Sequence, residues 1–162
     1  MKILMVIYYL IFIIYRYKMN IIFLDIDGVL NSAIGDGETI FDMEIAKLNL
    51  LKSIVDTCKT GVVITSDWRY SIRQKRQLVE VFTTYRIPIL GMLRDPGIDD
   101  EDNRGKQILD YINTYSKDID NIVILDDNDD GISEIFHEDF IKTNKFYGLD
   151  KSIANRIVDI LM

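Results

Sequence analysis

Residues 20–31 read NIIFLDIDGVLN, an apolar run that ends in two aspartates and a glycine. Residues 20–25 predict a short buried strand, and Asp25 and Asp27 stand two positions apart where it ends. Gly28 permits a sharp turn directly after them. Two carboxylates packed together are costly unless a cation or a proton lies between them, and Mg²⁺ suits an all-oxygen site. The pattern indicates a metal site in which one aspartate could attack phosphorus and the other could move a proton.

Strand-like and helix-like segments alternate along the rest of the chain. Apolar or β-branched runs predict four further strands, at residues 61–66, 87–92, 121–126 and 140–143. Apolar residues at a helical period, or short polar-capped segments, predict helices at 42–58, 71–85, 105–115, 131–137 and 152–161. Asp42 and Ser152 are candidate N-caps, and Pro88 suggests an edge position or a strand start. This alternation predicts one α/β domain with a mostly parallel five-stranded sheet and helices on both faces.

Polar residues lie at the carboxyl ends of three predicted strands. They are Asp25 and Asp27 after the first strand, Thr65, Ser66 and Asp67 after the second, and Asp126 and Asp127 after the fourth. Ligands of such sheets bind at this edge. The repeated placement of acids there predicts that these residues form one site.

The composition is that of an acidic globular protein. The chain has 162 residues, of which 48% are hydrophobic, and a formal net charge of −7. That charge argues against a protein that coats nucleic acid along its length, although a local basic patch could still hold one end of a strand. Cys58 is the only cysteine, so no intrachain disulfide forms, and a reducing compartment such as the cytoplasm is expected.

The first 18 residues differ from the rest of the chain. An uncharged, largely apolar run at 3–15 is followed by Arg16 and Lys18, and it is shorter than the roughly 20 residues that a membrane-spanning helix needs. We interpret residues 1–18 as a leader before a domain at 19–162, with a short membrane anchor as the alternative. On the first interpretation the protein is soluble and has no stable membrane partner.

Four short motifs follow one another along the chain: DIDGVLN at 25–31, VVITSDWR at 62–69, NRGKQI at 103–108 and VILDDNDD at 123–130. In this order they resemble the motifs of phosphatases of the haloacid dehalogenase (HAD) superfamily. Together with KTNKFYGLD at 142–150, they look like the HAD domain of the multi-domain "Swiss Army Knife" RNA repair proteins. The resemblance implies a Rossmann-like three-layer fold, Mg²⁺ as cofactor, and a phosphorylated substrate such as a nucleic-acid end.

The resemblance also implies roles for single residues. Asp25 would be the nucleophile that forms an aspartyl-phosphate, and Asp27 the general acid and base, whose backbone carbonyl also binds Mg²⁺. The implied metal ligands are Asp25, Asp27, Asp126 and Asp127, with Asp130 as a further candidate. The phosphoryl group would be bound by a hydroxyl, Ser66 or alternatively Thr65, and by a basic residue, Arg104 or Lys106, between which the sequence does not choose.

Residues 68–76 hold a local basic cluster made of Arg69, Arg73, Lys75 and Arg76 beside Trp68. Such charge runs are usually a solvated helix face. The alternative is a clamp for a nucleic-acid end, with Trp68 stacked on a base. Arg69 follows the second strand so closely that we also count it among the candidate phosphate-binding residues.

The segments after the first motif and after the second strand are too short for a cap domain. An open site is expected to admit a large substrate, such as a nucleic-acid end or a phosphoprotein. The predicted function is a Mg²⁺-dependent phosphomonoester hydrolase that acts on a nucleotide or polynucleotide phosphate. The alternatives are a phosphoprotein phosphatase and a non-catalytic binding protein on a HAD scaffold, which the intact pair Asp25 and Asp27 argues against.

Overall fold

A central parallel sheet organises the computed structural model, which describes residues 18–35, 37–94 and 103–162. Its five strands are β1 (Met19–Leu24), β4 (Thr60–Ile64), β5 (Ile89–Met92), β6 (Ile119–Asp126) and β7 (Phe140–Lys142). Their order is β5-β4-β1-β6-β7, and every neighbouring pair is parallel. The predicted five-stranded α/β sheet is therefore confirmed. Pro88 directly precedes β5, which is an edge strand, as expected of a residue without a backbone N–H.

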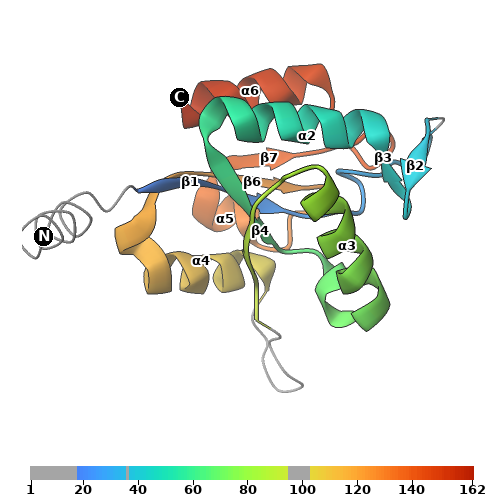
Figure 1. Ribbon diagram of the computed structural model, residues 1–162. Coiled ribbons are helices and arrows are strands. Elements are labelled where there is room, and N and C mark those ends of the chain that lie inside the picture. The colour runs from blue at the N-terminus through green and yellow to red at the C-terminus, as the bar shows by residue number, and fades with distance from the viewer. Residues whose placement is uncertain (1–17, 36, 95–102) are drawn as a thin grey trace, which may run out of the picture.

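Helices cover both faces of the sheet, which makes the three-layer, Rossmann-like sandwich that the sequence predicts (Figure 1). On one face α2 (Ile45–Cys58) lies beside α6 (Lys151–Leu161). On the other face lie α4 (Arg104–Tyr115) and α5 (Ile132–Phe136). A further helix, α3 (Ile72–Thr84), stands near the carboxyl ends of the strands.

The side chains of β1 alternate between two separate cores because successive residues of a strand point to opposite faces. Ile22 and Leu24 belong to the core under α2, α3 and α6. Ile21 and Phe23 belong to the second core, under α4 and α5. All four are buried, so β1 is covered on both faces, as its continuous apolar run requires.

Two predicted helix caps are wrong. Asp42 lies at φ 66° in the turn between β2 (Thr39–Ile40) and β3 (Met43–Glu44), a small antiparallel hairpin, and α2 begins only after it. Glu44 occupies the cap position without a capping side chain, because its carboxylate binds Lys47 and the Ser32 hydroxyl instead. At α6 the cap is Asp150, whose Oδ1 accepts from the backbone N–H of Ile153 at 2.9 Å, and not Ser152.

Among the described residues, nothing forms a separate cap domain. After β1 there is only the β2–β3 hairpin, and β4 is followed by a short 3₁₀ helix, η1 (Asp67–Tyr70), and by α3 and β5. None of the described helices has both the length and the apolar character that crossing a membrane requires. The predicted leader at residues 1–18 lies outside the described residues, apart from Lys18.

Candidate active site

The carboxyl ends of three neighbouring strands bring the predicted site residues together. The backbone N–H of Asp25, after β1, donates to the carbonyl of Leu125 in β6 at 3.0 Å. The N–H of Thr65, after β4, donates to the carbonyl of Leu24 at 2.9 Å. These main-chain bonds fix the three strand ends side by side. Residues that are far apart in the sequence therefore meet at one edge of the sheet.

An acid cluster, made of Asp25, Asp126 and Asp127, forms the centre of this edge. One carboxylate oxygen from each residue lies within 4.8 Å of the others. Asp126 is fully buried and Asp25 is buried. Gly28 makes room for Asp127, because a Cβ at this glycine would lie 2.5 Å from Asp127 Cγ, and its φ of +69° also favours glycine. The glycine of the DxDG motif therefore leaves the space that Asp127, of the later acidic pair, occupies.

Burial and neighbouring carboxylates raise the pKa of two residues of the acid cluster, Asp25 and Asp126. Burial, reinforced by the charge of Asp126, raises the pKa of Asp25 from 3.8 to about 7, although Arg104 opposes the shift. Burial also raises the pKa of Asp126, again against the effect of Arg104. Carboxylates that are forced together in this way favour a bound cation. Because the donors are all oxygen atoms, the cluster fits Mg²⁺, with Asp25, Asp126 and Asp127 as the residues that would hold it.

Arg104 is the basic residue whose side chain reaches the acid cluster. Its Nη1 lies 2.6 Å from Asp126 Oδ2 and 3.4 Å from Asp25 Oδ2, and its Nη2 lies 3.2 Å from Asp67 Oδ1. The side chain is only 13% exposed. These neighbouring carboxylates raise the pKa of Arg104 further above its ordinary value despite its burial. Its guanidinium is therefore charged at any physiological pH.

The start of α4 determines which of the two basic candidates points to the acids. Asn103 caps the helix by accepting from the backbone N–H of Lys106 at 3.0 Å, and Asp130 Oδ2 accepts from the N–H of Arg104 at 3.0 Å. Lys106 follows two residues later, which places it on nearly the opposite side of the helix, and it is exposed. The geometry favours Arg104 over Lys106 as the phosphate-binding cation. The carboxylate of Asp130, the further metal candidate, is thus a hydrogen-bond acceptor at the start of α4.

The two candidate hydroxyls differ in their surroundings. Ser66 lies close enough to Asp25 for its hydroxyl to lower the pKa of that carboxyl, and its Oγ accepts from the backbone N–H of Trp68 at 3.3 Å. Thr65 is fully buried, and its Oγ1 finds no hydrogen-bond partner among the described residues. Ser66 is therefore the better placed of the two to meet a phosphoryl group beside Asp25.

The Asp27 carboxylate is not one of the three that group within 4.8 Å, and both its oxygens have other partners. Its Oδ1 accepts from Asn31 Nδ2 at 2.7 Å, and its Oδ2 accepts from the indole Nε1 of Trp68 at 3.1 Å. Asn31 Oδ1 in turn accepts from the N–H of Gly28 at 2.9 Å. Sequence reasoning missed Asn31 and Trp68 as partners of Asp27. The Asn31 partnership had a visible signal, because residues four apart in a tight turn lie close together.

The suggested base-stacking role of Trp68 is wrong. Trp68 is only 3% exposed and packs into the core under α2, α3 and α6, because η1 turns its indole inwards directly after β4. A buried ring offers no face to a nucleobase. The stacking hypothesis came from the neighbouring charges Arg73, Lys75 and Arg76, none of which is buried.

Arg69 is also buried, and its guanidinium already has protein partners. It donates to the carbonyl of Thr65, to the Tyr70 hydroxyl and to Gln107 Oε1, the last at 3.2 Å, and it lies 4.2 Å above the centre of the Tyr70 ring. Burial lowers its pKa from the ordinary arginine value. These contacts tie η1 to α4. Direct binding of phosphate by Arg69 stays a prediction.

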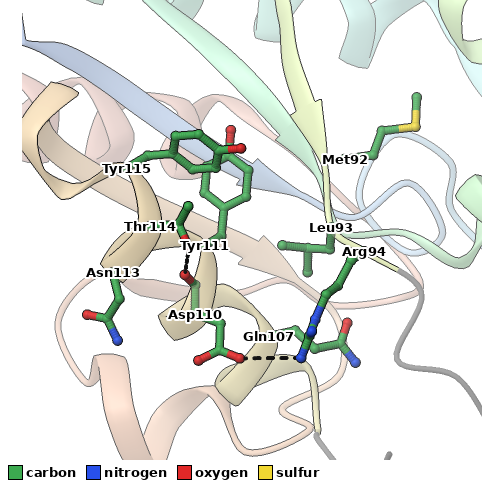
Figure 2. A pocket seen from close by; sticks show the side chains of 9 residues that line it. All are labelled: Met92, Leu93, Arg94, Gln107, Asp110, Tyr111, Asn113, Thr114 and Tyr115. Carbon is green, nitrogen blue, oxygen red and sulfur yellow. Dashed lines mark hydrogen bonds and ion pairs between the residues drawn. The ribbon is translucent and has the colours of Figure 1, made fainter.

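A groove of about 470 Å³ adjoins the site on the side of Gln107 (Figure 2). It runs between the end of β5 and α4, past Leu93, Tyr111 and Tyr115. Arg94 and Asp110 face each other across it at 3.6 Å. The residues of the acid cluster are not among those that line this groove.

The family model of the HAD domain in Swiss Army Knife RNA repair proteins matches residues 21–154. No curated protein matches the chain significantly. The matched range contains most of β1, every residue of the acid cluster, Arg104 and Ser66, and it extends into α6. It covers most of the described sheet and its helices. The order of the motifs, the parallel sheet and this match agree, and the chain belongs to the family of HAD domains found in Swiss Army Knife RNA repair proteins.

Proposed function

We propose that this protein is a Mg²⁺-dependent phosphomonoester hydrolase that works through an aspartyl-phosphate on Asp25. The observation that carries the proposal is the grouping around Asp25: its carboxylate lies beside those of Asp126 and Asp127, and Arg104 Nη1 lies 3.4 Å from its Oδ2. Neighbouring carboxylates that can bind a metal ion, and a fixed positive charge beside the nucleophile, suit phosphoryl transfer. In that reaction charge develops on the oxygens around phosphorus.

The proposed reaction has two steps. In the first, an Asp25 carboxylate oxygen attacks phosphorus, the bond from phosphorus to the leaving oxygen breaks, and Asp27 gives its proton to that oxygen. In the second, water attacks the phosphorus of the aspartyl-phosphate and passes a proton to Asp27. Inorganic phosphate leaves and the Asp25 carboxylate is restored. Bound by Asp25, Asp126, Asp127 and the backbone carbonyl of Asp27, Mg²⁺ would neutralise charge on the phosphoryl oxygens.

Arg104 and Ser66 orient the phosphoryl group in this scheme. Arg104 offers two N–H groups on a rigid, permanently charged fork, which matches two phosphoryl oxygens. Ser66 offers one hydroxyl from the turn after β4. Both belong to backbone segments that the sheet and the start of α4 hold in place, so little motion is needed to bring them to the substrate.

Hydrolysis of p-nitrophenyl phosphate tests the proposed activity. Turnover should require Mg²⁺, fall by about 100-fold or more in EDTA, and return when Mg²⁺ is added back, because the metal supplies several kcal/mol of charge stabilisation. Phosphorylated oligonucleotides should be assayed in parallel. If folded, Mg²⁺-loaded protein turned over none of these substrates, the proposal would fail in favour of a non-catalytic scaffold.

For the substrate, we propose a terminal phosphate of nucleic acid, processed in the cytoplasm. The family description, which names RNA repair proteins, supports this class. So does a turn at residues 144–148, whose aromatic side chains Phe146 and Tyr147 are 45% and 63% exposed. Asn144 fixes the turn by accepting from the N–H of Phe146 at 2.8 Å. The single cysteine, Cys58, is buried and has no second cysteine in the chain to pair with, which suits the cytoplasm.

This aromatic turn lies directly beside the loop that carries the two aspartates. Flanking it, Thr143 Oγ1 donates to the carbonyl of Gly28 at 2.8 Å, and the N–H of Leu149 donates to the carbonyl of Val29 at 2.9 Å. The ammonium of Lys145 lies 5.3 Å from the centre of the Phe146 ring. Exposed rings with a nearby cation are the usual means of binding a single-stranded end.

Replacing Tyr147 with alanine tests the nucleic-acid assignment. The KM for a 3′- or 5′-phosphorylated oligonucleotide should rise roughly tenfold, because one stacked base is lost, whereas turnover of p-nitrophenyl phosphate should be unaffected. Tyr115→Ala is the matched control, since Tyr115 is 47% exposed but ends α4 far along the helix from Arg104. Equal losses on both substrates, or no loss on the oligonucleotide, would count against a nucleic-acid end and favour a phosphoprotein or small substrate.

A further inference from the structure

The carboxylate of Asp27 is held at both oxygen atoms, although the residue itself is exposed. Asn31 Nδ2 donates to Oδ1 at 2.7 Å, and the indole Nε1 of Trp68 donates to Oδ2 at 3.1 Å. An exposed aspartate without such partners rotates freely about its side-chain bonds. Two fixed donors, one at each oxygen, restrict the Asp27 carboxylate to one orientation. The acid is therefore oriented before a substrate binds.

Trp68 is a rigid donor because its whole environment is fixed. It is 3% exposed and packed in the core under α2, α3 and α6. Its backbone N–H donates to Ser66 Oγ at 3.3 Å, and its carbonyl accepts from the N–H of Ser71 at 3.3 Å. One short 3₁₀ turn after β4 therefore carries both the candidate phosphate-binding hydroxyl and the donor that orients Asp27.

We propose that Trp68 is a positioning residue for the acid–base step: its indole N–H holds Asp27 in the orientation that protonates the leaving oxygen. This inference rests on the proposed phosphatase function. In the first step the Asp27 proton goes to the leaving oxygen as its bond to phosphorus breaks, and in the second Asp27 takes a proton from the attacking water. Trp68 touches neither substrate nor phosphorus in this scheme.

A positioning role makes the effect of Trp68 depend on the leaving group. A sugar or glycerol alkoxide is a poor leaving group and needs a well-aimed acid, whereas p-nitrophenolate leaves with little help. Trp68→Phe keeps most of the ring volume and removes the N–H. The kcat/KM for an alkyl phosphate, such as glycerol phosphate, reports only the first step and should fall roughly tenfold more than the kcat/KM for p-nitrophenyl phosphate.

The double variant provides the matched control. In an Asp27→Asn background, Trp68→Phe should cause no further loss on the alkyl phosphate, because the group that it positions is gone. A purely structural role for Trp68 predicts equal losses on both substrates and additive losses in the double variant, and either result would overturn the inference. Wild-type protein without any turnover would overturn the proposed function, and with it this inference.

A second measurement does not need the Trp68 variant to fold. Trp68 is the only tryptophan, so the chain has a single indole N–H resonance in a ¹H–¹⁵N spectrum. Replacing Asp27 with asparagine exchanges a charged acceptor for a neutral one and should move this resonance upfield. Asp42→Asn makes the same change in the turn between β2 and β3 and should leave it in place. An unmoved indole resonance in Asp27→Asn would show that the bond is absent in solution.

Discussion

Replacing Asp25 with asparagine should reduce phosphatase turnover on the order of 10⁴-fold or more, because an amide cannot form the aspartyl-phosphate. The same change should not weaken the fold. Asp25 is buried, and burial together with Asp126 raises its pKa to about 7, so its ionised form is unfavourable there. Asparagine has the same shape without the charge, while Asp126 keeps Arg104 at 2.6 Å. Initial rates with p-nitrophenyl phosphate and thermal unfolding would be measured on the same preparation.

Asp42→Asn is the matched control for this experiment. Asp42 is exposed in the turn between β2 and β3, with φ 66°, a conformation that asparagine tolerates as well as aspartate. This control makes the same chemical change away from the acid cluster and should retain full turnover. If Asp25→Asn kept more than a few per cent of the activity, another residue would have to be the nucleophile. A loss of activity accompanied by unfolding would point to a structural role instead.

Replacing Gly105 with alanine should cause the largest loss of stability among conservative changes near the site. A Cβ at this position would lie 2.3 Å from the backbone oxygen of Gly131 and 2.7 Å from its carbonyl carbon. Backbone atoms cannot yield as a flexible side chain does, so α4 would have to move away from the loop before α5. We expect the free energy of unfolding to fall by about 1–3 kcal/mol, the usual cost of overpacking.

Denaturant unfolding would measure this change, with Gly37→Ala as the control. A Cβ at Gly37 meets nothing within 4 Å, so its unfolding free energy should stay within about 0.5 kcal/mol of the wild type. Gly105→Ala should also lower turnover, because Arg104 is its neighbour and would move with the helix start. Equal stability of the two variants would mean that α4 packs less closely against Gly131 than the structure indicates.

The alternation of strands and helices, and the carboxyl-edge location of the acids, could be read from the sequence because each depends on local patterns. Residues 20–25 are apolar throughout and end in Asp25, and the chain after them repeats this plan. Parallel sheets then leave one edge for the site. Asp25, Ser66, Asp126 and Asp127 were expected at that edge, and the structure brings them there.

The identity of the basic residue could not be read in the same way. Arg104 and Lys106 are two residues apart on one helix, so they point in different directions. Which of them faces the acid cluster depends on where the helix starts. That start depends on Asn103 as the cap and on Asp130, a residue from a distant loop whose carboxylate accepts from the N–H of Arg104. A contact of this kind leaves no local signal in the sequence.

Tertiary contacts also overrode local preferences at two other positions. Asp42 is a good capping residue, yet the hairpin and the buried pair of Glu44 and Lys47, 2.6 Å apart, delay the start of α2. Trp68 stands beside several cations in the sequence, yet the turn after β4 points its ring into the core. Sequence proximity to charge says little about which way a side chain faces.

The direct main-chain bonding of β1 to β4 and β6 has a consequence for the energetics of substrate capture. The groups that would meet the phosphoryl oxygens are mounted on segments whose conformational entropy is already lost when the chain folds. Binding a substrate then need not order the protein first, and the interaction energy remains available for the transition state.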